Sequence, residues 1–182
     1  MFDLSERNKR AWDDLYGATD QPVWGRLPIG FLHEFLGYVT PTLGPSSRVL
    51  DAGGGEGRNV RALEQTRAWV CLCDASAHGL KKVRRVVHAQ VPCTQCDLGS
   101  LPFEKDLFDL VLMTDVVETL PDPHPALAEA SRVLKPGGML LCNTPGAGDP
   151  IAETDMDVIG EEAYLYRGRY FYRFVDAQAG GE

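Results

Sequence analysis

A glycine-rich turn that follows a short apolar run is the feature that most constrains the fold. Residues 49–57 read Val-Leu-Asp-Ala-Gly-Gly-Gly-Glu-Gly. The apolar residues predict a buried strand, and the glycines predict a tight turn that leads into a helix. Glycine lets the backbone pass close to a ligand where a Cβ atom would clash. Open parallel sheets bind ligands at the carboxyl ends of their strands, so this turn predicts a binding site there.

The spacing of these glycines argues against a dinucleotide site. A G-x-G-x-x-G pattern that starts at Gly53 requires glycine at position 58, where this chain has Arg58. The glycines stand instead at 53, 55 and 57. This spacing disfavours a loop that binds a pyrophosphate. It favours a loop that packs against a nucleoside and an amino-acid tail.

Short apolar runs alternate with helical patterns after this turn. Strands are expected at 48–51, 69–73, 91–96, 108–113 and 139–143, and helices at 57–66, from Ser76 to about Val87, and at 125–134. The run Lys135-Pro-Gly-Gly138 is expected to stop the last helix. This alternation predicts an α/β fold, a doubly wound and mostly parallel sheet with helices on both faces.

The two ends of the chain are expected to differ from this centre. Residues 1–45 look helical in patches and predict an N-terminal lid on the substrate side, with 46–182 as the ligand-binding part of one compact domain. Tyr16 and Trp24 are candidates to lie over the pocket, although large apolar residues more often serve packing. Residues 163–166 and 169–175 predict an antiparallel hairpin or a last helix, and the hairpin is favoured. The antiparallel part is therefore expected to be short or incomplete.

Acidic residues follow the second and third predicted strands. Asp74 ends the second strand, 23 positions after Asp51, where a carboxylate can accept hydrogen bonds from both hydroxyls of a ribose. Asp97 ends the third strand and is followed by Leu98. A carboxylate there can accept from an exocyclic amine while Leu98 lies against a base. The fourth strand leads to Thr114 and Asp115.

These residues together resemble the class I S-adenosylmethionine-dependent methyltransferases, in particular those that act on small molecules. Four motifs of that family have counterparts in order between about Arg48 and Thr144, over half of the chain. They are the Asp-Ala-Gly-Gly-Gly-Glu-Gly turn, Cys73-Asp74, Asp97-Leu98 and the Lys135–Gly138 segment. The resemblance implies the Rossmann-like methyltransferase fold and S-adenosylmethionine as the cofactor.

The resemblance also implies which residues hold the cofactor. Gly53 and Gly55 are expected to line its amino-acid end, with Asp51 at the same loop. Asp74 is expected to hold the ribose. Ala75, Asp97 and Leu98 are expected to surround the adenine, and Thr114 to lie beneath the methionine portion. No catalytic residue is assigned, because the acceptor atom is unknown and a base helps only a protonated nucleophile.

Candidates for such a base are Asp115, Glu118 and His33. In methyltransferases that act on quinone precursors, a histidine often follows the glutamate after the fourth strand. Here Glu118 is followed by Thr119, so that histidine is absent. The acceptor is therefore expected to be a small molecule without a more specific identity.

Composition bounds the partners and the compartment. The net charge of −8 lowers the expectation of a nucleic-acid partner, because such binding needs basic surface. No apolar run approaches the length of a membrane span, so a cytoplasmic protein without a membrane partner is expected. The odd count of five cysteines argues against a disulfide framework, and no metal site is expected, although Cys93-Thr-Gln-Cys96 has CxxC spacing.

Three other functions stay open from the sequence. One is a catalytically silent binding protein that keeps the cofactor site for regulation or assembly. A nicotinamide-dependent oxidoreductase is disfavoured by Arg58, and a nucleic-acid methyltransferase by the acidic charge. The oligomeric state does not follow from the sequence.

Overall fold

The central feature of the computed structural model is a five-stranded parallel sheet. The structure describes residues 3–87, 91–146, 156–160 and 163–173. The strand order is β3-β2-β1-β4-β5, and every neighbouring pair in the sheet is parallel. The strands are β1 (Arg48–Ala52), β2 (Trp69–Asp74), β3 (Cys93–Gln95), β4 (Phe108–Met113) and β5 (Leu134–Cys142). The predicted α/β fold is thereby confirmed.

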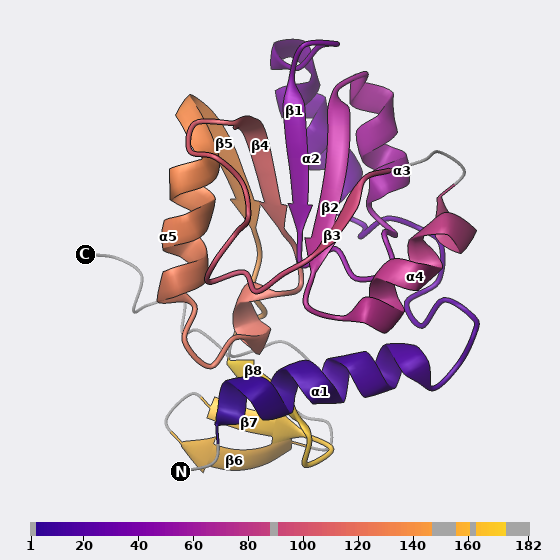
Figure 1. The fold of residues 1–182 in the computed structure, drawn as a ribbon, viewed down its shortest axis with the longest axis vertical. Coiled ribbons are helices and arrows are strands. Elements are labelled where there is room, and N and C mark those ends of the chain that lie inside the picture. Colours follow the sequence, from indigo (N-terminus) through magenta and orange to yellow (C-terminus); the bar gives the residue numbers. More distant parts are fainter. Residues whose placement is uncertain (1–2, 88–90, 147–155, 161–162, 174–182) are drawn as a thin grey trace.

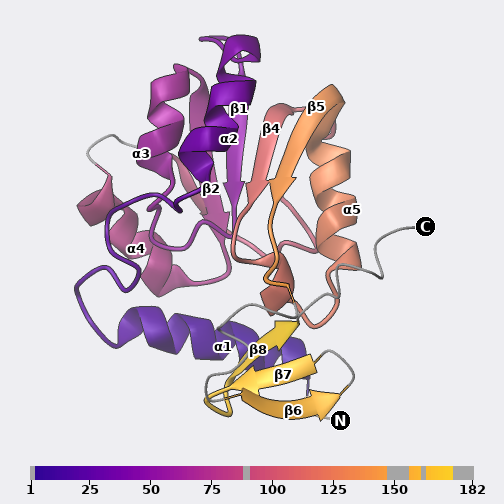
Figure 2. The ribbon, with the colours of Figure 1, turned by 180° about the vertical axis from the view of Figure 1, so that it is seen from behind.

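Helices cover both faces of this sheet, because the residues of its strands are apolar on both faces. On one face Val49 and Leu72 pack against α2 (Leu32–Val39), α3 (Val60–Leu63) and α4 (Ala77–Val86). On the other face Leu50 and Val111 pack against α5 (His124–Val133). Figures 1 and 2 show these two layers from opposite sides. Such continuous apolar strands are typical of parallel sheets that are buried on both faces.

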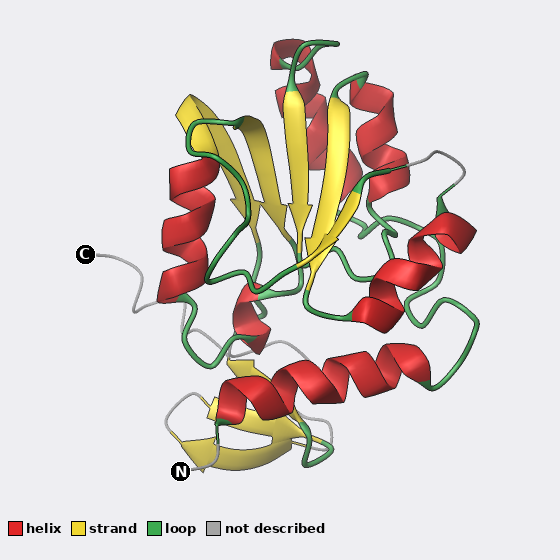
Figure 3. Ribbon diagram, in the orientation of Figure 1, coloured by secondary structure: helices red, strands yellow, loops and turns green. Residues whose placement is uncertain are grey.

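The carboxyl ends of the strands face a third layer. Figure 3 shows α1 (Leu4–Gly17) lying across this end of the molecule, beside a small antiparallel sheet. That sheet has the order β6-β7-β8, with β6 (Met156–Gly160), β7 (Ala163–Tyr166) and β8 (Tyr170–Arg173). The antiparallel sheet therefore lies beside the loops at the carboxyl ends of the parallel strands and helps to cover them.

The expected C-terminal hairpin is confirmed within the described residues. Strands β7 and β8 pair antiparallel, and the turn between them has positive φ angles at Arg167 (50°) and Gly168 (64°). The part of the prediction after Arg173 lies outside the described residues. The third strand, β6, was not foreseen, because its exposed residues carry no clear alternation of apolar and polar side chains.

Two predicted boundaries were wrong for backbone reasons. The helix expected at 57–66 is reduced to α3 followed by a 3-10 turn at Glu64–Thr66, because Gly57 has φ +80° and cannot begin a right-handed helix. The fifth strand, expected at 139–143, begins already at Leu134 and includes the segment Lys135–Gly138, which also ends the helix as expected. β5 lies at the edge of the sheet, where proline is tolerated, and its register with β4 shifts there.

Among the described residues there is neither a cluster of metal-binding side chains nor a membrane-spanning helix. Cys71 and Cys73 are buried in the core, whereas Cys93 is exposed. In the described part of the chain, no group of three or more His, Cys, Asp or Glu residues is arranged to hold a metal ion. Within the same residues, no helix has the length and apolarity needed to cross a membrane.

Candidate functional site

A cavity of about 600 Å³ lies at the carboxyl ends of the strands. The loops after β1, β2, β3, β4 and β5 form its floor, and α1, the loop that follows α1, and β8 form its other walls. Figure 1 shows the arrowheads of these strands pointing toward α1. The position agrees with the rule that open α/β sheets bind ligands beyond their strand ends. The cavity is large enough for a nucleoside and a small second ligand.

The glycine turn after β1 reaches the edge of this cavity. Gly53 N and Gly54 N both donate to Cys73 O, at 2.8 and 3.2 Å, which ties the turn to the end of β2. Gly53 lines the cavity with φ +77°, and a Cβ atom there would stand 2.5 Å from Val116 Cγ2. Position 53 therefore admits only glycine, for reasons of both conformation and space.

Asp74 is the acidic group at the end of β2 and faces the cavity. Its Oδ2 accepts from Gly55 N at 2.8 Å, and its Oδ1 accepts from Ser76 N at 2.7 Å. Burial raises the pKa of Asp74 above its ordinary value, although these two N–H groups act in the opposite direction. Each carboxylate oxygen has a second lone pair, so the group can still accept hydrogen bonds from two hydroxyls.

Asp97 and Leu98 occupy the next position along the cavity, after β3. Asp97 Oδ1 accepts from Gly99 N at 2.8 Å, and Oδ2 accepts from Lys9 Nζ of α1 at 2.6 Å. The hydrogen bond from Lys9 holds the pKa of Asp97 below its ordinary value. Leu98 and Ala75 supply apolar surface beside it. An adenine amine would thus share the Asp97 carboxylate with Lys9.

The eight predicted cofactor residues lie together, but not all of them reach the cavity. Those that line it are Gly53, Asp74, Ala75, Asp97, Leu98 and Thr114. Thr114 Oγ1 accepts from Asn59 Nδ2 at 2.8 Å, which fixes its side chain. Gly55 lies beneath Tyr16, and Asp51 is fully buried. These two residues are therefore expected to support the loop rather than contact a ligand.

Two of the three candidate bases line the cavity. Asp115 forms an ion pair with Arg58 and also exchanges two hydrogen bonds with Asn143 at 2.7 and 2.8 Å. Glu118 lies in η3 (Val117–Thr119), and burial raises its pKa to about 7. His33 is exposed on α2 and does not border the cavity.

An aromatic wall also lines the cavity, and of its three members the sequence indicated only Trp24 as a residue over the pocket. Trp12 of α1 lies 6.3 Å from Trp24 and 6.3 Å from Tyr172, measured between ring centroids. Trp12, Trp24 and Tyr172 all line the cavity. The alternation of Tyr170 and Tyr172 was the signal available for β8, but nothing local places that strand beside α1.

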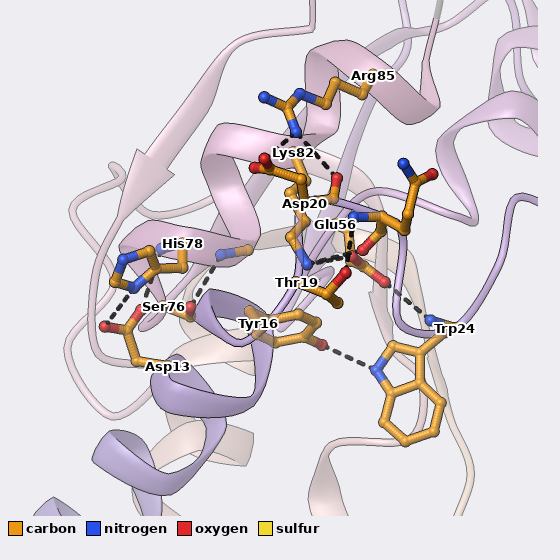
Figure 4. Close-up of polar contacts among 12 residues, drawn as sticks. Asp13, Tyr16, Thr19, Asp20, Trp24, Glu56, Ser76, His78, Lys82 and Arg85 are labelled. Atoms are coloured by element: carbon orange, nitrogen blue, oxygen red, sulfur yellow. Dashed lines mark hydrogen bonds and ion pairs between the residues drawn. The ribbon is translucent and has the colours of Figure 1, made fainter.

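Polar contacts hold α1 and the loop after it against α4 (Figure 4). Asp13 Oδ1 accepts from Ser76 Oγ at 2.6 Å and from His78 N at 3.0 Å. Trp24 Nε1 donates to Tyr16 Oη at 3.2 Å, and Trp24 N donates to Glu56 Oε1 at 2.9 Å. The cavity is therefore covered by a segment that is fixed in place.

The donor set of this cavity fits a nucleoside with an amino-acid tail. Carboxylates at Asp74 and Asp97 match ribose hydroxyls and an exocyclic amine, and Leu98 and Ala75 match the face of a base. Gly53 and Gly55 have positive φ angles and no side chains, so the turn leaves space above it for the amino-acid tail.

Comparison with known proteins identifies the family. The methyltransferase domain family matches residues 50–142, which is just over half of the chain. This chain belongs to that family of class I S-adenosylmethionine-dependent methyltransferases. S-adenosylmethionine is the methyl donor of this family.

Individual relatives agree with this assignment. The chain is 32% identical over 147 residues to a tRNA 5-carboxymethoxyuridine methyltransferase of Escherichia coli (strain K12), covering 76% of this chain and 53% of the relative. It is 33% identical over 141 residues to a demethylmenaquinone methyltransferase of Streptomyces avermitilis, covering 78% and 57%. The chain thus spans about half the length of the curated relatives it matches.

A solved structure shows the same fold. An S-adenosylmethionine-dependent methyltransferase from Methanosarcina mazei aligns with a TM-score of 0.64 over 84% of this chain and 80% of its own. Its sequence identity is 17%, so the likeness concerns the methyltransferase fold alone.

Proposed function

We propose that the chain transfers a methyl group from S-adenosylmethionine to a small-molecule acceptor. The observation that carries the proposal is the cavity itself. Its lining combines the strand-end acids Asp74 and Asp97 with the aromatic side chains of Trp12, Trp24 and Tyr172. The acids suit the cofactor, and the aromatic side chains suit a second, small ligand.

The residues of the chain act mainly by positioning. The cofactor supplies an activated methyl group, and transfer needs the acceptor atom close to it and in line. Asp74, Ala75, Asp97, Leu98 and Thr114 are proposed to orient the nucleoside, with Gly53 beside the amino-acid end. The covering segment around Tyr16 and Trp24 is proposed to exclude water from the reacting atoms.

Calorimetric titration with S-adenosylhomocysteine tests the cofactor site. Micromolar binding is expected for the native chain, and about ten- to a hundredfold weaker binding for Asp74→Asn, because a charged acceptor is replaced by a neutral one. Asp106→Asn, at an exposed position, is the matched control and should bind as the native chain does. No binding to a folded native chain contradicts the proposal.

A tRNA acceptor is the second candidate, because the Escherichia coli relative is described as a tRNA methyltransferase. The exposed Lys81, Arg84 and Arg85 of α4 are the basic surface that such a partner would need. The net charge of −8 opposes it. Methyl transfer to tRNA but to no member of a metabolite panel would replace the small-molecule proposal.

A silent cofactor-binding protein is the third candidate. It shares the binding site but not the reaction. Binding of S-adenosylhomocysteine without methyl transfer to any acceptor, small molecule or tRNA, would favour it.

A further inference from the structure

Glu118 is a buried carboxylate in the cavity, and one of its two oxygens lacks a partner among the described residues. It follows β4 in η3, and only 4% of its surface is exposed, yet it lines the cavity. Its Oε2 has no hydrogen-bond partner among the described residues. A buried polar atom without a partner is costly, so such atoms are rare, and one that borders a cavity can be satisfied by a ligand bound there.

Burial, together with a neighbouring negative charge, brings the pKa of Glu118 close to neutral pH. Burial is the largest cause that raises its pKa to about 7, and the negative charge of Asp115 acts in the same direction. Of the elements packed against it, α1 presents the neutral Asn8, whose Nδ2 donates to Thr119 O. β8 presents Arg173, which donates to Pro121 O. A base of this pKa is well matched to removing a proton at neutral pH.

The aromatic wall approaches this same region. Asn8 joins three elements, because it donates to Thr119 O at 2.6 Å and accepts from Phe171 N at 3.0 Å. Trp12 lies one helical turn further along α1 and contacts the ring of Tyr172. The buried Nε1 of Trp12 also has no partner among the described residues. Flat aromatic rings pack well against such side chains.

The cations that line the cavity already have carboxylate partners. Lys9 pairs with Asp97 and Arg58 pairs with Asp115. Lys82, just behind the wall, pairs with Glu56. An anionic acceptor therefore finds no unpaired cation among the described lining residues. The positive sulfonium of the cofactor, in turn, opposes an ammonium acceptor.

We propose that Glu118 is the catalytic base for methylation of a planar, uncharged phenolic acceptor that stacks on Trp12 and Tyr172. The inference rests on the proposed function and adds the substrate class and the base. The hydroxyl oxygen of the acceptor forms the new C–O bond with its lone pair. The C–S bond breaks with its electron pair kept on sulfur, which becomes a neutral thioether. The hydroxyl proton passes to the Glu118 carboxylate and then to water.

Equilibrium binding of three matched probes tests this assignment without a reaction. The probes are 3-hydroxyacetophenone, its methyl ether 3-methoxyacetophenone, and the anion 3-acetylbenzoate. Each is titrated into the native chain saturated with S-adenosylhomocysteine, and binding is followed by quenching of tryptophan fluorescence. The pH is held about one unit above the Glu118 pKa of about 7, so that the carboxylate is ionised.

The phenol is expected to bind about tenfold more tightly than its ether, because only the phenol donates to the carboxylate. Glu118→Gln should lose most of this preference and keep its affinity for S-adenosylhomocysteine. Its methyl transfer to the phenol should fall by about a hundredfold. Glu104→Gln, at an exposed position, is the matched control and should keep the preference.

Three results overturn the inference. They are no binding of the phenol, an unchanged preference in Glu118→Gln, and tighter binding of the benzoate than of the phenol. A Trp12→Leu variant provides a second test, because loss of the ring should weaken phenol binding about tenfold even if Glu118→Gln fails to fold. S-adenosylhomocysteine should still bind to the native chain and to both variants. If it does not bind to the folded native chain, the proposed function is contradicted instead.

Discussion

Asp51 places a buried carboxyl group directly beneath the glycine turn. It is fully buried, and neither of its oxygens has a partner among the described residues. Burial, with a smaller contribution from Asp74, raises its pKa from 3.8 to about 7. Between these two values the folded chain keeps a proton that the unfolded chain has lost, so stability must fall as pH rises through this range.

Asp51→Asn should therefore flatten the dependence of stability on pH. The native chain is expected to lose on the order of 2–4 kcal/mol of unfolding free energy across that range, and the variant substantially less. Part of the slope remains, because the raised pKa of Glu118 acts with the same sign. Urea unfolding at both ends of the range measures it, with the exposed Asp157→Asn as control. Equal slopes in native chain and variant would show that Asp51 does not titrate as expected.

The residues of the candidate site that lie at the ends of strands could be predicted from the sequence. Asp74, Asp97 and Thr114 lie together because parallel strands end at one edge of a sheet, and this follows from the pattern alone. Lys9 and Tyr172 could not be predicted. Lys9 reaches Asp97 across 88 positions of the chain. Such contacts depend on how helices and sheets pack, which local sequence does not encode.

At the scale of elements, α4 holds the segment that covers the cavity. Lys82 is 5% exposed, donates to Gln21 O at 3.0 Å and lies 3.4 Å from Glu56 Oε2. Glu56 in turn accepts from Trp24 N. Lys81, Arg84 and Arg85 of the same helix are exposed, whereas Lys82 is buried, because the loop after α1 folds back over this turn of α4.

Lys82→Met should destabilise the chain by about 3–5 kcal/mol, since it leaves the buried Glu56 carboxylate without its cation. The exposed Lys81→Met on the same helix is the matched control and should cost little. Adding Glu56→Gln to Lys82→Met should recover most of the loss, because no unpaired charge remains. Denaturant unfolding of the four proteins decides the matter. If the two methionine variants are equally stable, the ion pair does not hold the covering segment.

At the scale of the whole molecule, one of the buried side chains that join the two ends of the described chain is that of Asn8. Asn8 of α1 is 4% exposed and bonds to Thr119 O of η3 and to Phe171 N of β8. The last of these contacts spans 163 positions. The five-stranded sheet has its own core and does not depend on this contact. The layer formed by α1 and β8 should therefore loosen separately from the sheet.

Asn8→Ala tests this separation, because it leaves the buried Thr119 O and Phe171 N without partners. The unfolding free energy should fall by about 1–3 kcal/mol. Amide hydrogen exchange should accelerate in α1, η3 and β8 while β1 and β4 keep their protection. Asn8→Asp should be intermediate, since it can still accept from Phe171 N, and the exposed Arg7→Ala should behave as the native chain. Faster exchange throughout the sheet would mean that the covering layer and the sheet unfold as one cooperative unit, and that the cavity cannot open without loss of the fold.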